Sequence, residues 1–391
     1  MKRIWPFTFY FLYFAALSSL MPFFVLFYQG LGFNGTQIGL LTGIPPLVSL
    51  VASPFWTGLA DARRWHKAVM GLGILVAVLI IFLLPSLRAF GVVFLSIILF
   101  NAFISPVSSL ADSGTMTMLG EERAMYGRVR LGGTIGWGLF APIAGALVEN
   151  FGLKIGFWTF SGLMLINLFV SQKFVHGTQE DTGSRSGGIR VFLNNRRWLS
   201  FLFISLLGGI GSFSAASYLF PYMAELGASE STMGLALTIS TLSELPIFFL
   251  GHRLVRRFGS YGLLTLTLAM FGVRALLYAA VSAPWMVLIV QVFGGMIFPA
   301  MWTAGVSYAD ENAPAGLKST AQGLFGAVSF GVGSAVSGFI AGPLLESIGG
   351  RGMFLVIGIL ILVGLGVAET VRRFFPEKEG VPEAVSLSSD K

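Results

Sequence analysis

Twelve long apolar stretches, separated by short polar or glycine-containing segments, run along this chain. Each is about 20 residues long and carries few charges, which is the length that an α-helix needs to cross a membrane. The pattern predicts membrane-spanning helices at roughly 5–29, 37–59, 67–85, 90–112, 127–149, 152–173, 198–223, 231–250, 260–281, 284–307, 320–345 and 353–373. The fold class expected from this pattern is an all-α membrane protein.

The composition excludes most other classes of protein. Of the 391 residues, 55% are hydrophobic and only 11% are charged, whereas a soluble domain carries about 25% charged residues. A soluble enzyme and a disordered chain are therefore both excluded. The 50 glycines follow no repeat and favour membrane helices that pack closely. The chain has no cysteine, so it forms neither a disulfide nor a thiolate metal site.

The distribution of basic residues predicts how the chain lies in the membrane, because Lys and Arg are retained on the cytoplasmic side. With the N-terminus inside, 21 of the 25 basic residues fall on the cytoplasmic side, three fall outside, and Arg274 lies within a span. Both termini are therefore expected in the cytoplasm, and the expected location is the inner (plasma) membrane. The net charge of +7 reflects this bias, and no basic soluble face predicts a nucleic-acid partner.

The chain divides into two similar halves. Gly58 to Arg64 matches Gly251 to Arg257 at an offset of 193, and Gly152 to Phe157 matches Gly349 to Phe354 at an offset of 197. Parallel repeats of this kind predict a binding site near the membrane midplane, between the halves. The predicted organisation is an N-terminal six-helix bundle at 1–176, a hydrophilic cytoplasmic linker at 177–197, a C-terminal six-helix bundle at 198–375 and a cytoplasmic tail at 376–391.

Three motifs carry a family resemblance. Gly58-Leu-Ala-Asp-Ala-Arg-Arg-Trp-His-Lys67 is similar to the loop signature of the major facilitator superfamily, with the second glycine of that signature replaced. Tyr126-Gly-Arg-Val-Arg-Leu-Gly-Gly-Thr-Ile-Gly-Trp137 resembles the start of helix five in the lactose and phenylpropionate permeases, and Phe100-Asn-Ala-Phe-Ile-Ser-Pro106 resembles the phenylpropionate permease group. The chain is identified as a member of this superfamily, in the lactose permease and phenylpropionate permease-like group. The resemblance implies the major facilitator fold, with two pseudo-symmetric six-helix bundles of 12 transmembrane helices.

The first half contains a candidate substrate site on its fourth and fifth predicted helices. Asn101, Ser105 and Asp112 are spaced to share one helix face, and a charge at membrane depth costs about 3 kcal/mol unless it has a partner or a function. In the lactose permease, a carboxylate and an arginine at the separation of Asp112 and Arg130 hold the sugar, and a tryptophan at the position of Trp137 stacks on its ring. The resemblance therefore implies substrate binding here. The alternative is an ion pair between Asp112 and Arg130 that only joins two helices.

The second half places its deepest charges, Glu244 and Arg274, on neighbouring predicted helices, and Gln291 lies on the next one. The resemblance implies that Glu244 and Arg274 bind substrate, and a structural ion pair is the alternative. The helix-ten relay that couples the lactose permease to protons is replaced here by Gln291, Gly294 and Ile297. If the chain couples to protons, Glu244 or Asp112 must carry them.

The loop signature itself predicts a gating role. Asp61 lies at the cytoplasmic end of the second predicted helix, too far from the midplane to touch a substrate. Together with Arg64 it is expected to latch the cytoplasmic ends of the two bundles. Arginines such as Arg64, Arg128 or Arg130 are its expected partners.

These features predict a secondary active transporter that works by alternating access. The first hypothesis is proton-coupled import (symport) of a sugar-like or aromatic-acid-like solute. The alternative is a proton-driven efflux antiporter for amphipathic compounds, because Ala141-Pro-Ile-Ala-Gly145 is a degraded form of an antiporter motif. An enzyme ranks last, since no nucleophile–base set or metal cluster is present, and no cofactor is expected. The expected partners are a small-molecule substrate, protons and membrane lipids, and the expected oligomeric state is a monomer.

Overall fold

The computed structural model describes residues 3–177, 189–314 and 316–374, which form helices and no strand. The first half contains α1 (Ile4–Leu20), η1 (Met21–Phe23), α2 (Phe24–Gly30), α3 (Gly35–Arg63), α4 (His66–Leu83), η2 (Leu84–Ser86), α5 (Phe90–Leu119), η3 (Gly120–Met125), α6 (Tyr126–Phe151) and α7 (Lys154–Ser171). The second half contains α8 (Ile189–Leu193), α9 (Arg196–Glu225), α10 (Glu230–Phe258), α11 (Ser260–Ala280), α12 (Pro284–Asn312), α13 (Lys318–Gly326), η4 (Ala327–Gly333) and α14 (Ser334–Phe374).

These helices make twelve membrane crossings. Nine described helices are long and apolar enough to span a membrane, and the bent helix α10 makes ten. Two of the nine, Phe90–Phe151 and Lys318–Phe374, contain 62 and 57 residues, or about 85–95 Å of helix against a bilayer core of about 30 Å. Each turns back on itself, at η3 and at Gly349 respectively. Each therefore supplies two crossings, and the predicted twelve-helix fold is confirmed.

Several helices extend beyond the apolar stretches that predicted them. Helix α10 continues to Phe258, and α5 continues to Leu119, because a hydropathy pattern detects only the apolar part of a helix whose end projects into water. Both helices end at a glycine with positive φ, Gly120 at 55° and Gly259 at 71°, a conformation that favours glycine. Within α10, a bend of 62° separates Glu230–Ile247 from Phe249–Phe258, and Pro246 lies just before it.

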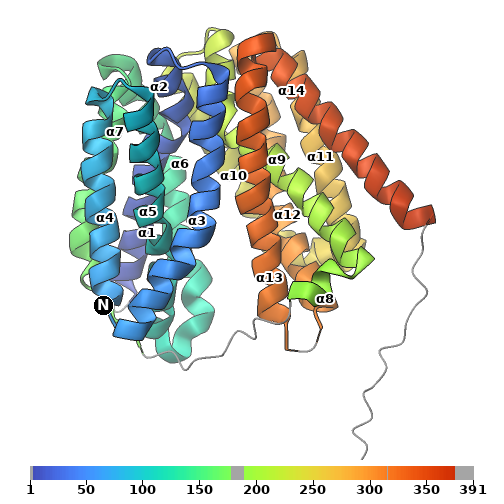
Figure 1. Cartoon of the computed structure of the whole chain (residues 1–391), viewed down its shortest axis with the longest axis horizontal. Coiled ribbons are helices and arrows are strands. Elements are labelled where there is room, and N and C mark those ends of the chain that lie inside the picture. The colour runs from blue at the N-terminus through green and yellow to red at the C-terminus, as the bar shows by residue number, and fades with distance from the viewer. Residues whose placement is uncertain (1–2, 178–188, 315, 375–391) are drawn as a thin grey trace, which may run out of the picture.

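The two halves stand side by side, with α1–α7 on one side and α9–α14 on the other (Figure 1). The start of α1 lies at one end of the bundle, here called the terminal end, and the last part of α14 runs towards that end from the opposite one (Figure 1). The opposite end, which carries the turns after α2, α6 and α9, is called the distal end. Residues 178–188 of the expected linker, and 375–391 with the expected tail, lie outside the described residues, so the domain boundaries stay a prediction.

The halves meet at the distal end along two helix pairs, α3 with α14 and α6 with α10, here called the distal seams. A Cβ atom on Gly338 of α14 would lie 2.5 Å from the backbone nitrogen of Gly43 in α3. A Cβ on Gly234 of α10 would lie 2.5 Å from the carbonyl oxygen of Ala141 in α6. Contact this close between backbones requires residues without side chains, as is common between membrane helices.

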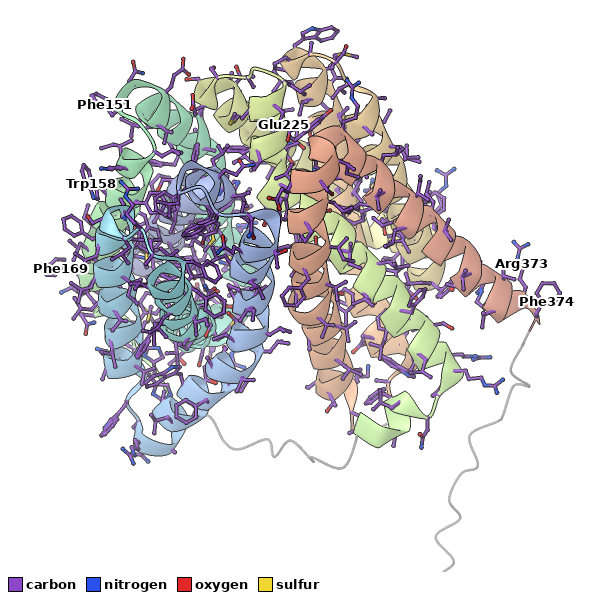
Figure 2. All side chains as sticks on the ribbon, turned by 45° about the horizontal axis from the view of Figure 1, so that its top comes forward. Phe151, Trp158, Phe169, Glu225, Arg373 and Phe374 are labelled. Atoms are coloured by element: carbon purple, nitrogen blue, oxygen red, sulfur yellow. The ribbon has the colours of Figure 1, made fainter. Side chains whose placement is uncertain are left out.

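The outer surface suits lipid. Phe151, Trp158 and Phe169 project from the outer side of the first half (Figure 2) and are 71%, 46% and 73% exposed. Large apolar side chains at this exposure are unfavourable in water. They fit the hydrocarbon of a membrane, so the multi-pass arrangement agrees with both the helix lengths and the surface.

Candidate functional site

Asp112 of α5 is held by two tyrosines from other helices. Its Oδ1 accepts hydrogen bonds from the hydroxyl of Tyr10 in α1 at 2.6 Å and from the hydroxyl of Tyr126 in α6 at 3.0 Å. The hydroxyl of Tyr10 also lies 3.3 Å from Oγ1 of Thr115, one turn along α5. The carboxylate of Asp112 therefore links α1, α5 and α6 through hydrogen bonds.

Arg130 of α6 lies beside this carboxylate without pairing with it. Its guanidinium packs over the ring of Tyr10, at 4.7 Å from the ring centroid, and over the ring of Phe14, at 4.6 Å. Its Nη1 is buried and has no hydrogen-bond partner among the described residues. No ion pair between Arg130 and Asp112 occurs in the described part of the chain. Tyr10 stands between them, with its ring under the cation and its hydroxyl on the carboxylate.

The other predicted residues of the first half are partly exposed and separate from this cluster. The side-chain amide of Asn101 donates to the carbonyl of Ile97 at 2.9 Å, and the hydroxyl of Ser105 donates to the carbonyl of Ala102 at 3.5 Å, so both bond within α5. Trp137 follows Arg130 by seven residues on α6, about 10 Å along the helix axis. All three side chains are thus partly exposed. Among the described residues, no hydrogen bond joins Asn101, Ser105 and Trp137 to one another.

In the second half, Arg274 of α11 is fixed by its neighbours. Its Nε donates to the hydroxyl of Tyr278 at 2.9 Å, and its Nη2 donates to Oε1 of Gln291 in α12 at 3.1 Å. The hydroxyl of Tyr278 donates to the same Gln291 oxygen at 2.8 Å. A Cβ on Gly294 would lie 2.8 Å from the guanidinium carbon, so the glycine makes room for the arginine. Gln291 is only 1% exposed, and the hydrogen bond that it accepts fixes the position of Arg274.

Glu244 of α10 is half-buried and makes no side-chain hydrogen bond or ion pair with any described residue. Arg274 acts on it electrostatically across a longer gap. The direct Glu244–Arg274 ion pair considered from the sequence is therefore absent among the described residues. Glu244 is a carboxylate of the second half that has no fixed partner.

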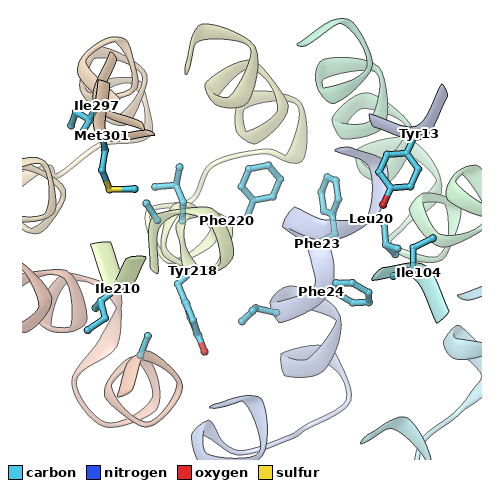
Figure 3. Packing of buried hydrophobic residues seen from close by; sticks show 14 of the residues in the cluster. Tyr13, Leu20, Phe23, Phe24, Ile104, Ile210, Tyr218, Phe220, Ile297 and Met301 are labelled. Atoms are coloured by element: carbon cyan, nitrogen blue, oxygen red, sulfur yellow. The ribbon is translucent and has the colours of Figure 1, made fainter. Parts of the chain in front are cut away.

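A cluster at the distal end was not predicted from the sequence. The hydroxyls of Thr42 in α3 and Tyr218 in α9 lie 2.7 Å apart across the two halves, and Tyr218 also donates to the carbonyl of Gly338 at 3.2 Å. Beside them, the rings of Phe23 and Phe220 meet edge to face with centroids 5.1 Å apart (Figure 3). Taken singly, such aromatic residues look like ordinary packing residues. The signal that could have identified them is the pairing of helices across the repeat.

Comparison with known proteins identifies the family. The model of the MFS_1 like family matches residues 5–356. The chain belongs to this family of major facilitator transporters. The "Maltose permease" of Geobacillus stearothermophilus is 27% identical over 94% of this chain and 95% of its own length. The "Probable 3-phenylpropionic acid transporter" of Escherichia coli (strain K12) is 27% identical over 90% of this chain and 93% of its own length.

A solved structure supports the same fold. A mutant of the nucleoside transporter NupG superposes with a TM-score of 0.85 at 16% identity, covering 95% of this chain and 99% of that one. The relatives and this neighbour are membrane transporters. The chain is therefore a multi-pass transporter of small solutes in the major facilitator superfamily, and it is not an enzyme.

In this transporter, the described contacts close one end of the bundle. The four hydrogen bonds that join the described parts of the two halves all lie towards the distal end, between Gly35 and Glu346, Thr42 and Tyr218, Glu149 and Ser231, and Gly138 and Thr238. No ion pair joins the halves within the described ranges. The structure therefore has its halves locked at the distal end.

The predicted gate residues lie at the other, terminal end. Oδ1 of Asp61 lies 2.7 Å from Nε2 of His66, the first residue of α4. Arg64 ends α3 in the left-handed conformation at φ 57°, and its backbone bonds back to the helix. The described partner of Asp61 is therefore a histidine, whereas the sequence suggested an arginine. His66 stacks on His176, with ring centroids 4.9 Å apart, and burial lowers the pKa of His176 below its usual value.

Asp61→Asn is expected to slow transport while leaving substrate affinity unchanged. The substitution removes the exposed charge that faces His66, and the effect on rate should be about two- to tenfold because the group is exposed. The measurement is the initial transport rate and the half-saturating concentration in vesicles, with Glu121→Gln as an exposed carboxylate control at the same end. A loss of affinity with unchanged maximal rate would contradict the gating role.

Proposed function

We propose that this transporter imports a small organic anion with an aromatic body, coupled to protons and by alternating access. The observation that carries the proposal is Arg130, a half-buried cation whose buried Nη1 has no acceptor among the described residues. The partners of the proposed cycle are the substrate, protons and membrane lipids. The proposed unit is a monomer in the plasma membrane with both termini in the cytoplasm, as the basic residues indicate.

The unpaired donor of Arg130 is energetically costly. A buried donor without an acceptor costs about 1–3 kcal/mol, and more when the group is charged. Asp112 does not relieve this cost, because its Oδ1 receives two tyrosine hydroxyls and it forms no ion pair with Arg130. A substrate carboxylate would supply the missing acceptor to Arg130. Binding of an anion would then be favoured over binding of a neutral solute.

The surroundings of Arg130 favour a ring on the substrate. The rings of Tyr10 and Phe14 already flank the guanidinium, and Trp137 lies further along the same helix. A planar apolar body gains contact area against such aromatic side chains. One relative carries the name of a 3-phenylpropionic acid transporter and another that of a maltose permease, so an aromatic acid and a sugar are the two classes to compare.

Glu244 supports the coupling part of the proposal. A carboxylate at membrane depth is costly unless it has a partner or a function, and Glu244 has no hydrogen-bond partner in the described residues. Arg274 is held by Tyr278 and Gln291, so it stays in place when Glu244 changes its charge. Glu244 is therefore the proposed proton carrier, with Asp112 as the second candidate.

Arg130→Gln is expected to weaken binding of 3-phenylpropionate by about 10- to 100-fold, since it removes a charged hydrogen bond. Binding to purified protein is measured by thermal shift over a concentration series, because a ligand of the folded state raises its stability. The control is Arg128→Gln, an exposed arginine two residues earlier on α6, which should bind as the wild type does. Binding of maltose but not of the acid would overturn the substrate class, and unchanged affinity of Arg130→Gln would overturn the site.

Glu244→Gln is expected to abolish accumulation driven by a proton gradient, while exchange of labelled for unlabelled substrate persists. Exchange needs no net proton release, whereas uphill import does. Both are measured in proteoliposomes with an imposed pH gradient. Glu369→Gln is the control, because that carboxylate is already bonded to the hydroxyl of Tyr261 at 2.8 Å. Retained accumulation in Glu244→Gln would exclude Glu244 as the carrier, and proton-driven export by the wild type would favour the antiporter.

A further inference from the structure

A carboxylate of the second half binds the start of a helix in the first half. Oε2 of Glu346 in α14 accepts a hydrogen bond from the backbone nitrogen of Gly35, the first residue of α3, at 2.6 Å. The first backbone N–H groups of a helix have no partner within the helix, and they carry its positive partial charge. The contact therefore joins a negative side chain to a complementary helix end across the α3–α14 seam.

The second seam contains the same contact with the halves exchanged. Oε2 of Glu149 in α6 accepts a hydrogen bond from the backbone nitrogen of Ser231, near the start of α10, at 3.0 Å. Here the carboxylate comes from the first half and the helix end from the second. The two contacts therefore point in opposite directions across the interface.

The internal repeat relates the two carboxylates and the glycines that precede them. Glu149 and Glu346 differ by 197 in number, as do Gly145 and Gly342, the glycines one turn before them. A Cβ on Gly342 would strike the carbonyl oxygen of Gly35, and a Cβ on Gly145 would strike that of Glu230. The two seams are thus pseudo-symmetric copies, and each ends in a carboxylate.

Each of the two helices also has a cap of its own. The side chain of Asn34 accepts from the nitrogen of Gln37 at 2.9 Å in α3, and that of Ser229 accepts from the nitrogen of Thr232 at 3.3 Å in α10. Asn34 and Ser229 differ by 195 in number. In both helices the glutamate from the other half binds an N–H that the cap leaves free. These bonds are therefore additional to local helix capping.

We propose that Glu149 and Glu346 are a matched pair of positioning residues that hold the distal end closed during transport. Their bonds exist only while the halves touch, so they stabilise the distally closed state and are lost when the distal end opens. Both carboxylates are exposed and regain water on release, which keeps each contribution small and the closure reversible. The proposal rests on the alternating access of the proposed function and on no particular substrate.

Glu225 provides a matched control within the same end of the molecule. Its Oε2 accepts from the backbone nitrogen of Gly350 at 2.8 Å, and it lies beside α14 near the distal end of the second half (Figure 2). This is the same kind of bond, but both partners belong to the second half. Opening of the distal end would leave it intact.

The test measures the distance between the two halves at the distal end. The chain contains no cysteine, so Lys154→Cys at the start of α7 and Ser282→Cys between α11 and α12 accept spin labels without background. Distance distributions are recorded by pulsed electron resonance in lipid nanodiscs, without substrate, for Glu149→Gln, Glu346→Gln, the double variant and Glu225→Gln.

Each single variant should raise the ratio of distally open to closed molecules by about two- to fivefold, as expected for a charge at a helix terminus. The double variant should give about the product of the two, because both bonds break in one transition at separate sites. Glu225→Gln should match the wild type. A wild-type distribution in the double variant, or an equal shift in Glu225→Gln, would overturn the proposal. Failure of the substrate proposal would leave these distances shifted, so the two outcomes are distinguishable.

Discussion

Close backbone contact between the two halves is the constraint on which the rest of this structure depends. In a membrane the hydrophobic effect does not drive helices together, so association relies on packing and polar contacts. Glycines such as Gly338 and Gly234 allow that packing at the distal seams, because a Cβ at either position would meet backbone atoms at 2.5 Å. The seams decide which end of the transporter is closed. They therefore decide from which end the proposed substrate site is reached.

The sequence predicted the fold because bilayer thickness imposes a length that hydropathy reveals directly. It also predicted the repeat, and the offset of 197 found from Gly152 and Gly349 is the one that relates Glu149 to Glu346. It predicted close helix packing from the glycines, but not which helix of the other half each glycine contacts. Glycine is frequent throughout the chain, and composition alone does not tell a glycine that contacts the other half from one such as Gly58, which has no atom near its Cβ position.

The sequence named the charged residues of the candidate site, but it predicted only some of their contacts. An ion pair between Asp112 and Arg130 was the alternative to substrate binding, and in the structure Tyr10, 102 residues from Asp112 in sequence, lies between them. A structural ion pair between Glu244 and Arg274 was likewise the alternative to substrate binding, and in the structure Arg274 donates to Gln291 and Tyr278 instead. In the first half a tyrosine hydroxyl from a distant segment bonds the carboxylate, whereas in the second half the arginine bonds Tyr278, one turn along the same helix, and Gln291 of the next helix. The contact of Tyr10 depends on packing between distant segments, which spacing along one helix does not reveal.

The most direct test of this account asks whether the two ends of the transporter open and close in opposition. Gly338→Val places a side chain where the backbone of Gly43 lies, so it should force the distal seam apart. Distances are recorded in lipid nanodiscs with a distal label pair at Lys154→Cys and Ser282→Cys, and separately with a terminal pair at Ala124→Cys and Arg256→Cys. We expect the distal distance to lengthen and the terminal distance to shorten. An unchanged distal distance, or lengthening at both ends, would contradict it.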